Sequence, residues 1–141
     1  MLIGEHYHNM DAKGRVSIPA KFRDDLGGTF VLSKGLDDCL YAYSVKEWEG
    51  FQQDLLALRG SDGQMVRRFF FSGATECEID AQGRVVIPPN FRAYAKLEKE
   101  LVIIGVSNRA EIWSKAEWEK YISKSSFDSE EIANAMERLG L

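Results

Sequence analysis

An internal repeat constrains the fold of this chain more than any other feature of its sequence. The segment DAKGRVSIPAKFR at residues 11–23 returns as DAQGRVVIPPNFR at residues 80–92, and nine of the thirteen positions are identical. The likeness continues from SVKEWE at 44–49 to SKAEWE at 114–119. A duplication of this kind predicts two copies of one structural unit. We place the copies at residues 1–72 and 73–141.

The boundary between the copies is expected in a polar, glycine-containing stretch. Residues 59–63 read RGSDG, a composition typical of a connection between regular elements. An apolar segment at 65–71 follows and predicts a helical piece before the second copy begins. The first copy therefore ends in helices, and the second copy starts with a strand.

Each copy begins with a strand and a turn. Residues 5–10 and 74–79 alternate in character, which is typical of a strand with one buried face. Asp-Ala-Lys-Gly or Asp-Ala-Gln-Gly follows. Aspartate at the first turn position accepts backbone N–H bonds, and glycine at the fourth adopts the left-handed conformation. We expect a hairpin in each copy, with its turn built on a pair of residues: Asp11 with Gly14, and Asp80 with Gly83.

The strands that return from the turns have one apolar and one basic side. Successive side chains of a strand point to opposite faces, so Val16 and Ile18 share one face and Arg15 lies on the other. The second copy repeats this pattern around Arg84. The apolar side predicts the core, and both arginines are therefore expected to project away from it.

The rest of each copy predicts a short helix, a second hairpin and further helices. The second hairpins are expected at 29–43 and 101–113, and Ser-x-x-Glu capping boxes at 44–47 and 114–117 start the next helices. A polar cap at 128–129 begins a last amphipathic helix. The predicted fold class is therefore α+β: two tandem repeats of β-hairpin and short helix, flanked by helices. Hairpins this small are marginal alone, so the copies complete one another's core, within the chain or between chains.

Positive charge is concentrated in the repeated segments. The whole chain has a formal charge of -4 at pH 7, which excludes a global positive field that attracts nucleic acid or anionic lipid. Segment 11–23 has four bases and one acid, segment 80–92 has two bases and one acid, and the remainder therefore carries -8. A polyanion partner must meet a local patch. The candidate DNA-binding residues are Arg15, Arg84, Lys13, Lys21, Arg23 and Arg92.

Charge and spacing leave two interpretations of the turn arginines open. A ribbon hairpin tipped with Lys and Arg has a suitable size and shape to meet DNA phosphates and a groove, with Asp11 and Asp80 holding the turns that aim Arg15 and Arg84. Alternatively, each aspartate and arginine form an exposed ion pair within the hairpin, which contributes at most about 1 kcal/mol. A duplicated Asp-x-x-Gly-Arg serves either role.

The two repeated segments resemble the signature segments of the MraZ family of bacterial transcriptional regulators. The resemblance covers nearly the whole chain, including the start MLIGEHYHNMD and both tryptophan-bearing capping boxes. It implies two AbrB-like modules that form a swapped-hairpin β-barrel. It also implies that the arginines of the two DxxxR motifs, Arg15 and Arg84, contact DNA. Because the first copy has Lys13 and Lys21 where the second has Gln and Asn, the first hairpin is expected to bind more tightly.

The resemblance further implies a function and a set of partners. The family consists of sequence-specific DNA-binding regulators that form ring-shaped homo-oligomers. They bind repeated promoter boxes on double-stranded DNA upstream of the bacterial division and cell-wall gene cluster, so we expect a cytoplasmic, nucleoid-associated repressor. The alternative is an oligomeric protein-partner or scaffold module without DNA binding. From the helical segment itself, whose aromatic side chains suit a core or a subunit interface, we expect subunit contacts at Phe69, Phe70 and Phe71.

Other function classes have little support in the sequence. His6 and His8 share a strand face, yet no third ligand stands at a recognisable spacing, so no metal site is expected. The sequence contains no catalytic arrangement and no phosphate-binding glycine loop. We therefore expect no enzymatic activity, no cofactor and no small-molecule substrate. The longest apolar run, 101–106, is far shorter than the roughly 20 residues of a membrane-spanning helix. Cys39 and Cys77 are expected to be small buried side chains.

Overall fold

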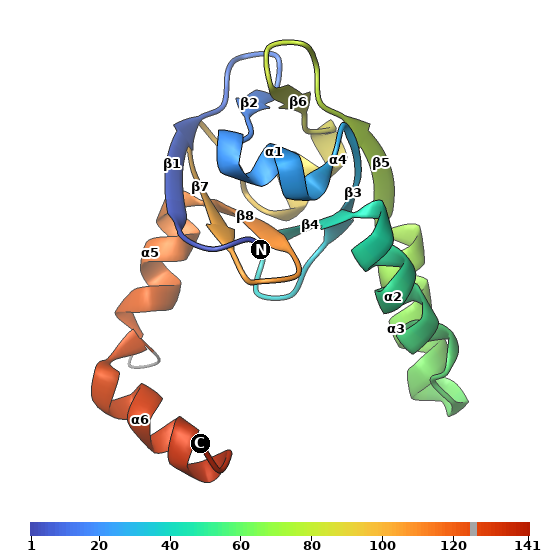
Figure 1. Ribbon diagram of the computed structural model, residues 1–141, viewed down its shortest axis with the longest axis vertical. Helices are drawn as coiled ribbons and strands as arrows, with labels where there is room; N and C mark the ends of the chain where they lie inside the picture. Colours follow the sequence, from blue (N-terminus) through green and yellow to red (C-terminus); the bar gives the residue numbers. More distant parts are fainter. Residues whose placement is uncertain (125–126) are drawn as a thin grey trace.

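The computed structural model describes residues 1–124 and 127–141 (Figure 1). Its mixture of helices and strands confirms the α+β class. The strands are β1 (Glu5–Asn9), β2 (Arg15–Ser17), β3 (Thr29–Lys34), β4 (Leu40–Ser44), β5 (Ala74–Glu78), β6 (Arg84–Val86), β7 (Glu100–Gly105) and β8 (Ala110–Ser114). The helices are α1 (Ala20–Leu26), α2 (Val45–Leu56), α3 (Gly60–Ser72), α4 (Pro89–Tyr94), α5 (Lys115–Ser123) and α6 (Ser129–Arg138).

One antiparallel sheet combines strands from both copies of the repeat, in the order β1-β7-β8-β4-β3-β5. The hairpins β3–β4 and β7–β8 form where the sequence predicts the second hairpin of each copy, and β4 pairs with β8 to join them. At the edges, β1 of the first copy pairs with β7 of the second, and β5 of the second copy pairs with β3 of the first. The copies therefore complete one another within a single chain.

The first hairpin of each copy is closed only at its turn, which differs from the hairpin that we expected. The strand that leaves each turn does not pair with the strand that enters it. Instead, β2 pairs with β6 in a separate two-stranded ribbon, because β1 and β5 are hydrogen-bonded to the edges of the large sheet. Strand exchange between the copies thus creates the ribbon.

The main core lies between the large sheet and the ribbon. The residues of the ribbon that were predicted to face inward are buried, with Val16 and Ile18 each 1% exposed. Helices α1 and α4 pack beside them through Phe22 and Phe91, which are 1% and 4% exposed. The buried side of the returning strands is thereby confirmed, and their other side faces outward.

A second apolar cluster lies where the helices leave the sheet. On one side, Tyr43 of β4 stacks on Phe51 of α2, with ring centroids 5.4 Å apart, and Phe51 meets Phe70 of α3 at 5.1 Å. On the other side, Trp113 of β8 meets Trp118 of α5 at 5.2 Å. Figure 1 shows the pair α2–α3 and the pair α5–α6 as two legs that extend away from the ribbon.

Both capping boxes start helices where the sequence predicts them. The hydroxyl of Ser44 accepts the backbone N–H of Glu47 at 3.2 Å, and the hydroxyl of Ser114 accepts that of Glu117 at 3.3 Å. The last helix begins after Asp128, whose carboxylate accepts the N–H of Glu130 at 3.2 Å. Local capping chemistry therefore fixes these three helix starts.

Helix α3 begins earlier than predicted. The sequence favoured a helical piece over 65–71, whereas the helix starts at Gly60 and includes most of the polar stretch 59–63. A Cβ at Gly63 would lie 2.9 Å from the backbone of Leu58, so the helix approaches the end of α2 closely there. Tertiary packing therefore outweighs the weak helix propensity of the two glycines. The division of the chain at residue 72 remains a prediction.

Within residues 1–124 and 127–141, every helix is too short or too polar to span a lipid bilayer.

Candidate nucleic-acid interface

The first turn is held by the side chain of Asp11. Its Oδ1 accepts the backbone N–H groups of Lys13 and Arg15, both at 2.9 Å, and its Oδ2 accepts the Nε–H of Arg15 at 2.7 Å. Gly14 donates its N–H to the carbonyl of Asp11 at 3.0 Å and has a φ of +79°, which glycine adopts without steric cost. One carboxylate therefore fixes both the turn and the arginine that follows it.

The second turn has the same hydrogen bonds. Asp80 accepts the backbone N–H groups of Gln82 and Arg84 at 2.9 Å and the Nε–H of Arg84 at 3.1 Å. Gly83 has a φ of +78°. The duplicated sequence thus builds one geometry twice, and each copy presents an arginine at the same place beside its turn.

Hydrogen bonding lowers the pKa of both turn aspartates below the usual range. The backbone N–H of Arg15 is the largest cause for Asp11, and the backbone N–H of Arg84 is the largest cause for Asp80. Because these bonds favour the ionised carboxylate, both aspartates remain charged at neutral pH and keep their arginine partners.

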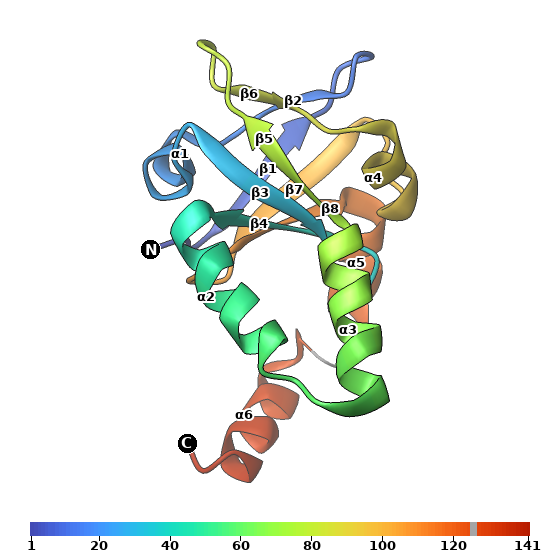
Figure 2. The same cartoon turned by 90° about the vertical axis from the view of Figure 1, so that its right-hand side faces the viewer.

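The ribbon brings the two arginines to one face. Arg15 lies opposite Val86, and Ser17 lies opposite Arg84. Alternate positions of paired strands share a face, so Arg15 and Arg84 are diagonal neighbours on the outer side of the ribbon, with Cα atoms about 7–8 Å apart. Figure 2 shows both turns rising from the ribbon at the same end of the molecule. The duplication therefore produces one paired surface.

Both arginines are partly exposed, and each uses one nitrogen on its own aspartate. The exposed fraction of the side chain is 31% for Arg15 and 30% for Arg84, and each is paired through Nε. Among the described residues, neither guanidinium group has a further hydrogen-bond partner, which leaves the two terminal nitrogens of each available for a ligand. The ion pair and a DNA contact are therefore compatible, since the aspartate can hold the guanidinium in position while its far edge binds.

Arg23 and Arg92 each lie against the turn of the other repeat. A Cβ at Gly83 would lie 2.7 Å from Nε of Arg23, and a Cβ at Gly14 would lie 2.9 Å from Cζ of Arg92. Proximity in the sequence pairs Arg23 with the first turn and Arg92 with the second. The structure reverses this pairing because the ribbon sets each turn beside the helix of the opposite repeat. The two turns are thus supported crosswise.

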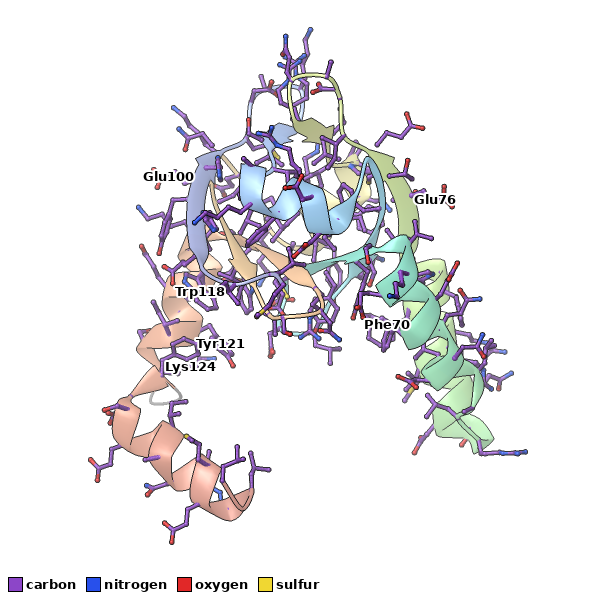
Figure 3. All side chains as sticks on the ribbon, viewed as in Figure 1. Phe70, Glu76, Glu100, Trp118, Tyr121 and Lys124 are labelled. Carbon is purple, nitrogen blue, oxygen red and sulfur yellow. The ribbon has the colours of Figure 1, made fainter. Side chains whose placement is uncertain are left out.

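The predicted lysines complete the cationic surface. Lys13 is exposed within the first turn, and Lys21 is exposed on α1. Figure 3 shows nitrogen-bearing side chains around the two turns. Lys21 is on the helix that lies beside the second turn, so the two lysines are divided between the two turns although the first repeat supplies both.

The three consecutive phenylalanines lie at the end of α3, on the leg that points away from the turns (Figure 3). Phe70 is 8% exposed and packs within the chain, Phe69 is half-buried, and Phe71 is 37% exposed beside Trp48. Phe70 is therefore largely covered by its own chain, whereas Phe71 retains a free surface. Their assignment to a subunit interface remains a prediction.

His6 and His8 are part of the packed edge strand β1. The ring of His6 meets that of Phe22 edge-on, with centroids 5.0 Å apart, and burial lowers the pKa of His8. Across residues 1–124 and 127–141, no three His, Cys, Asp or Glu side chains gather in a way that suits a metal ion.

Sequence reasoning missed two features. The first is the close approach of an arginine to each turn glycine, although the repeated Phe-Arg at 22–23 and 91–92 was a usable signal. The second is a partly buried ion pair on the far side of the sheet, where Glu111, 7% exposed, accepts Nη2–H of Arg109 at 2.6 Å and Nε1–H of Trp113 at 3.0 Å. The alternate spacing of these three residues along β8 and its preceding turn places them on one face.

The fold and the site together define a class of protein: two interlocked α+β repeats that present paired, aspartate-held arginines at one end. The model of the family described as "MraZ protein, putative antitoxin-like" matches residues 1–68 and 70–139. The chain therefore belongs to the MraZ family.

Similar proteins span the whole chain. The chain is 55% identical to a protein of Alkaliphilus oremlandii, covering 100% of both chains, and 56% identical to a protein of Pelotomaculum thermopropionicum, covering 100% of this chain and 99% of that one. Both relatives are named "Transcriptional regulator MraZ". A solved structure, "The solution structure of PHS018 from pyrococcus horikoshii", matches 79% of this chain and 88% of its own at 16% identity, with a TM-score of 0.34.

Proposed function

We propose that this chain is a sequence-specific DNA-binding transcriptional regulator. The observation that carries the proposal is the placement of Arg15 and Arg84 on the outer face of one ribbon, each held by an aspartate and each with terminal nitrogens available. The names of its relatives support the same function. The duplicated turns then act as one DNA-reading unit.

The dimensions of the ribbon suit the major groove. The groove is about 12 Å wide and admits a two-stranded β-ribbon. Neighbouring base pairs are about 3.4 Å apart, so the Cα atoms of Arg15 and Arg84, about 7–8 Å apart, are separated by about two base-pair steps, and each guanidinium group lies toward its own turn. Arginine binds the O6 and N7 atoms of guanine through two parallel N–H groups. Lys13 and Lys21 supply phosphate contacts, and Arg23 and Arg92 add charge while they support the turns.

The regulator acts as a ring-shaped homo-oligomer on repeated promoter boxes. A single protomer offers few phosphate contacts, and the net charge of -4 opposes long-range attraction to DNA. Several protomers that engage successive boxes raise the affinity by about 10²–10⁴ through effective concentration alone. In this proposal the ring represses the division and cell-wall gene cluster.

The proposal is tested by fluorescence anisotropy with a duplex from upstream of the chain's own gene and a shuffled duplex of equal length. We expect tighter binding to the first duplex, and a log–log salt slope of about -0.9 for each phosphate contact. Equal affinity for both duplexes at every salt concentration would contradict sequence-specific recognition.

A protein-partner or scaffold module is the second candidate, because α6 exposes apolar side chains to solvent. Ile132 and Met136 are each 43% exposed. If the chain is such a module, it should assemble into an oligomer but bind neither duplex. Measuring the mass of the protein in solution, together with the anisotropy experiment, therefore separates the two functions.

A further inference from the structure

The outer face of the ribbon carries one apolar side chain among polar ones. The residues of this face occupy alternate positions of β2 and β6, and they are Arg15, Ser17, Arg84 and Val86. Val86 is 54% exposed, whereas Ser17 is half-buried. Figure 2 shows the two turns standing to either side of this face, and among the described residues no helix or strand crosses over it. Val86 is therefore open to a ligand that approaches between the turns.

The two repeats differ at this apolar position. Residues 11–23 and 80–92 differ at four positions, and only the pair Ser17 and Val86 lies on the ribbon strands. The ribbon otherwise presents the same groups from both repeats, since an arginine held by an aspartate stands beside each turn. The pair of Ser17 and Val86 therefore makes the two halves of the outer face chemically different.

Val86 lies beside one arginine in particular. It is directly opposite Arg15 in the register of the ribbon, which places the two Cβ atoms about 4.5–5.5 Å apart. The guanidinium group of Arg15 is held by Asp11 toward its own turn, so it leaves Val86 uncovered. A lone exposed valine is ordinary on a protein surface. This valine is distinguished by its place, because a ligand that spans Arg15 and Arg84 also meets Val86.

The chemistry of valine limits what Val86 can recognise on double-stranded DNA. Its side chain neither donates nor accepts a hydrogen bond, so it gains nothing from a phosphate oxygen. In the major groove, thymine presents its C5-methyl group, and apolar side chains recognise thymine by contact with this methyl group. Neighbouring base pairs are about 3.4 Å apart, so a base that meets Val86 lies within about one or two steps of the base that meets Arg15.

We infer that Val86 determines sequence specificity by contacting the methyl group of a thymine beside the base that Arg15 binds. This inference rests on the proposed DNA-binding function and adds a specificity-determining residue to it. Ser17 offers a hydroxyl group at the matching place, and serine binds base edges without a fixed preference. The two halves of the ribbon consequently read different bases, and the thymine sets the direction in which the ribbon lies on the duplex.

Replacement of thymine by uracil tests this contact, because uracil pairs with adenine as thymine does and lacks only the C5-methyl group. Fluorescence anisotropy measures the affinity of the parent protein for the duplex from upstream of its own gene. It also measures the affinity for a series of duplexes in which single thymines are replaced by uracil. The loss of one buried methyl group corresponds to about fourfold weaker binding. We expect this loss at the thymine that Val86 contacts and little change at the others.

Val86→Ser gives the second repeat the residue of the first and should remove the dependence on the methyl group. Serine at position 17 shows that the strands of the ribbon accommodate this residue. We expect the variant to bind the thymine duplex about fourfold more weakly than the parent protein does, and to bind the uracil duplex with the same affinity as the thymine duplex. Val86→Ala, which lacks the hydroxyl group, should behave in the same way.

Two matched variants test whether the effect belongs to Val86. Ser17→Ala changes the matching position on the same face. Val106→Ala shortens a valine that is 37% exposed and follows β7 at the end of the sheet away from the turns. Both variants should keep the fourfold difference between thymine and uracil. The thermal melt and the solution mass of the Val86 variants should equal those of the parent protein, because the side chain of Val86 is exposed.

The results separate this inference from the proposed function. If the parent protein prefers its own duplex to the shuffled duplex and no uracil weakens binding, only the inference is wrong. The inference is also wrong if Val86→Ser keeps the effect of uracil, or if both Val86 variants unfold or change the mass of the assembly. If the parent protein binds both duplexes equally, or binds neither, the proposed function is wrong and the inference is wrong with it.

Discussion

At the scale of single residues, each turn depends on one carboxylate. Asp11 accepts two backbone N–H groups and one side-chain N–H group, and Asp80 does the same. An exposed ion pair alone contributes little to stability, so the main effect of the ion pair is to orient the arginine, while the two backbone N–H bonds hold the turn. The conformation of the turn and the direction of the cation are thereby set by the same side chain.

Substitution of the turn glycines should destabilise the protein. Gly14→Ala and Gly83→Ala each place a Cβ at positive φ, which costs about 1–2 kcal/mol, and each displaces the arginine that lies against the turn. Gly28→Ala is the matched control, because Gly28 has no positive φ and a Cβ there meets nothing within 4 Å. Thermal melts measure the difference. Equal melting temperatures for all three variants would show that the turns tolerate a side chain.

The lowered pKa values of the two turn aspartates predict that the stability of the protein depends on pH. Their folded-state pKa lies below the ordinary value of about 3.8, so their stabilisation is fully present above that value and is lost as pH falls through the folded pKa. The difference in melting temperature between the parent protein and Asp11→Asn should therefore be constant at neutral pH and shrink below pH 3.8. A difference that grows on acidification would have the wrong sign for this account.

At the scale of the elements, strand exchange makes the two repeats depend on each other. β1 and β2 of the first repeat find their partners only in the second, and β5 pairs back onto the first. Neither the ribbon nor the complete sheet exists within one repeat. The outward face that carries Arg15 and Arg84 is consequently a product of both repeats.

Fragments divided between the repeats should not fold alone. Residues 1–72 lack the partners of β1 and β2, so we expect the isolated fragment to give no cooperative melt as a monomer. Mixing it with residues 73–141 should restore the β-sheet signal in circular dichroism. Cooperative unfolding of monomeric 1–72 would contradict the dependence of the repeats on each other.

The sequence predicted where most helices and strands lie, but it did not predict which strands pair with one another. Capping boxes and alternating polarity are local signals, and they located α2, α5 and the hairpins β3–β4 and β7–β8. The turn residues predicted a hairpin, but a turn constrains only the residues nearest to it. Which strand pairs with β2 depends on the whole sheet, so neither the ribbon nor the crosswise position of Arg23 and Arg92 followed from residue spacing.

At the scale of the whole molecule, charge and apolar surface are separated. The two repeated segments are cationic in a chain with a net charge of -4, and they lie at the end opposite the helical legs (Figure 2). The legs carry exposed apolar side chains, among them Ile132 and Met136 of α6. One end therefore presents positive charge, and the other end presents apolar surface.

The central claim is that Arg15 and Arg84 bind DNA and contribute little to folding. The most direct test compares the duplex affinity of the double variant Arg15→Ala, Arg84→Ala with that of Arg68→Ala, which removes an exposed arginine from α3. We expect each turn arginine to contribute about 1–3 kcal/mol to binding and at most about 1 kcal/mol to stability, while Arg68→Ala binds nearly like the parent protein. A folded double variant with parental affinity would contradict the account, as would a double variant that fails to fold.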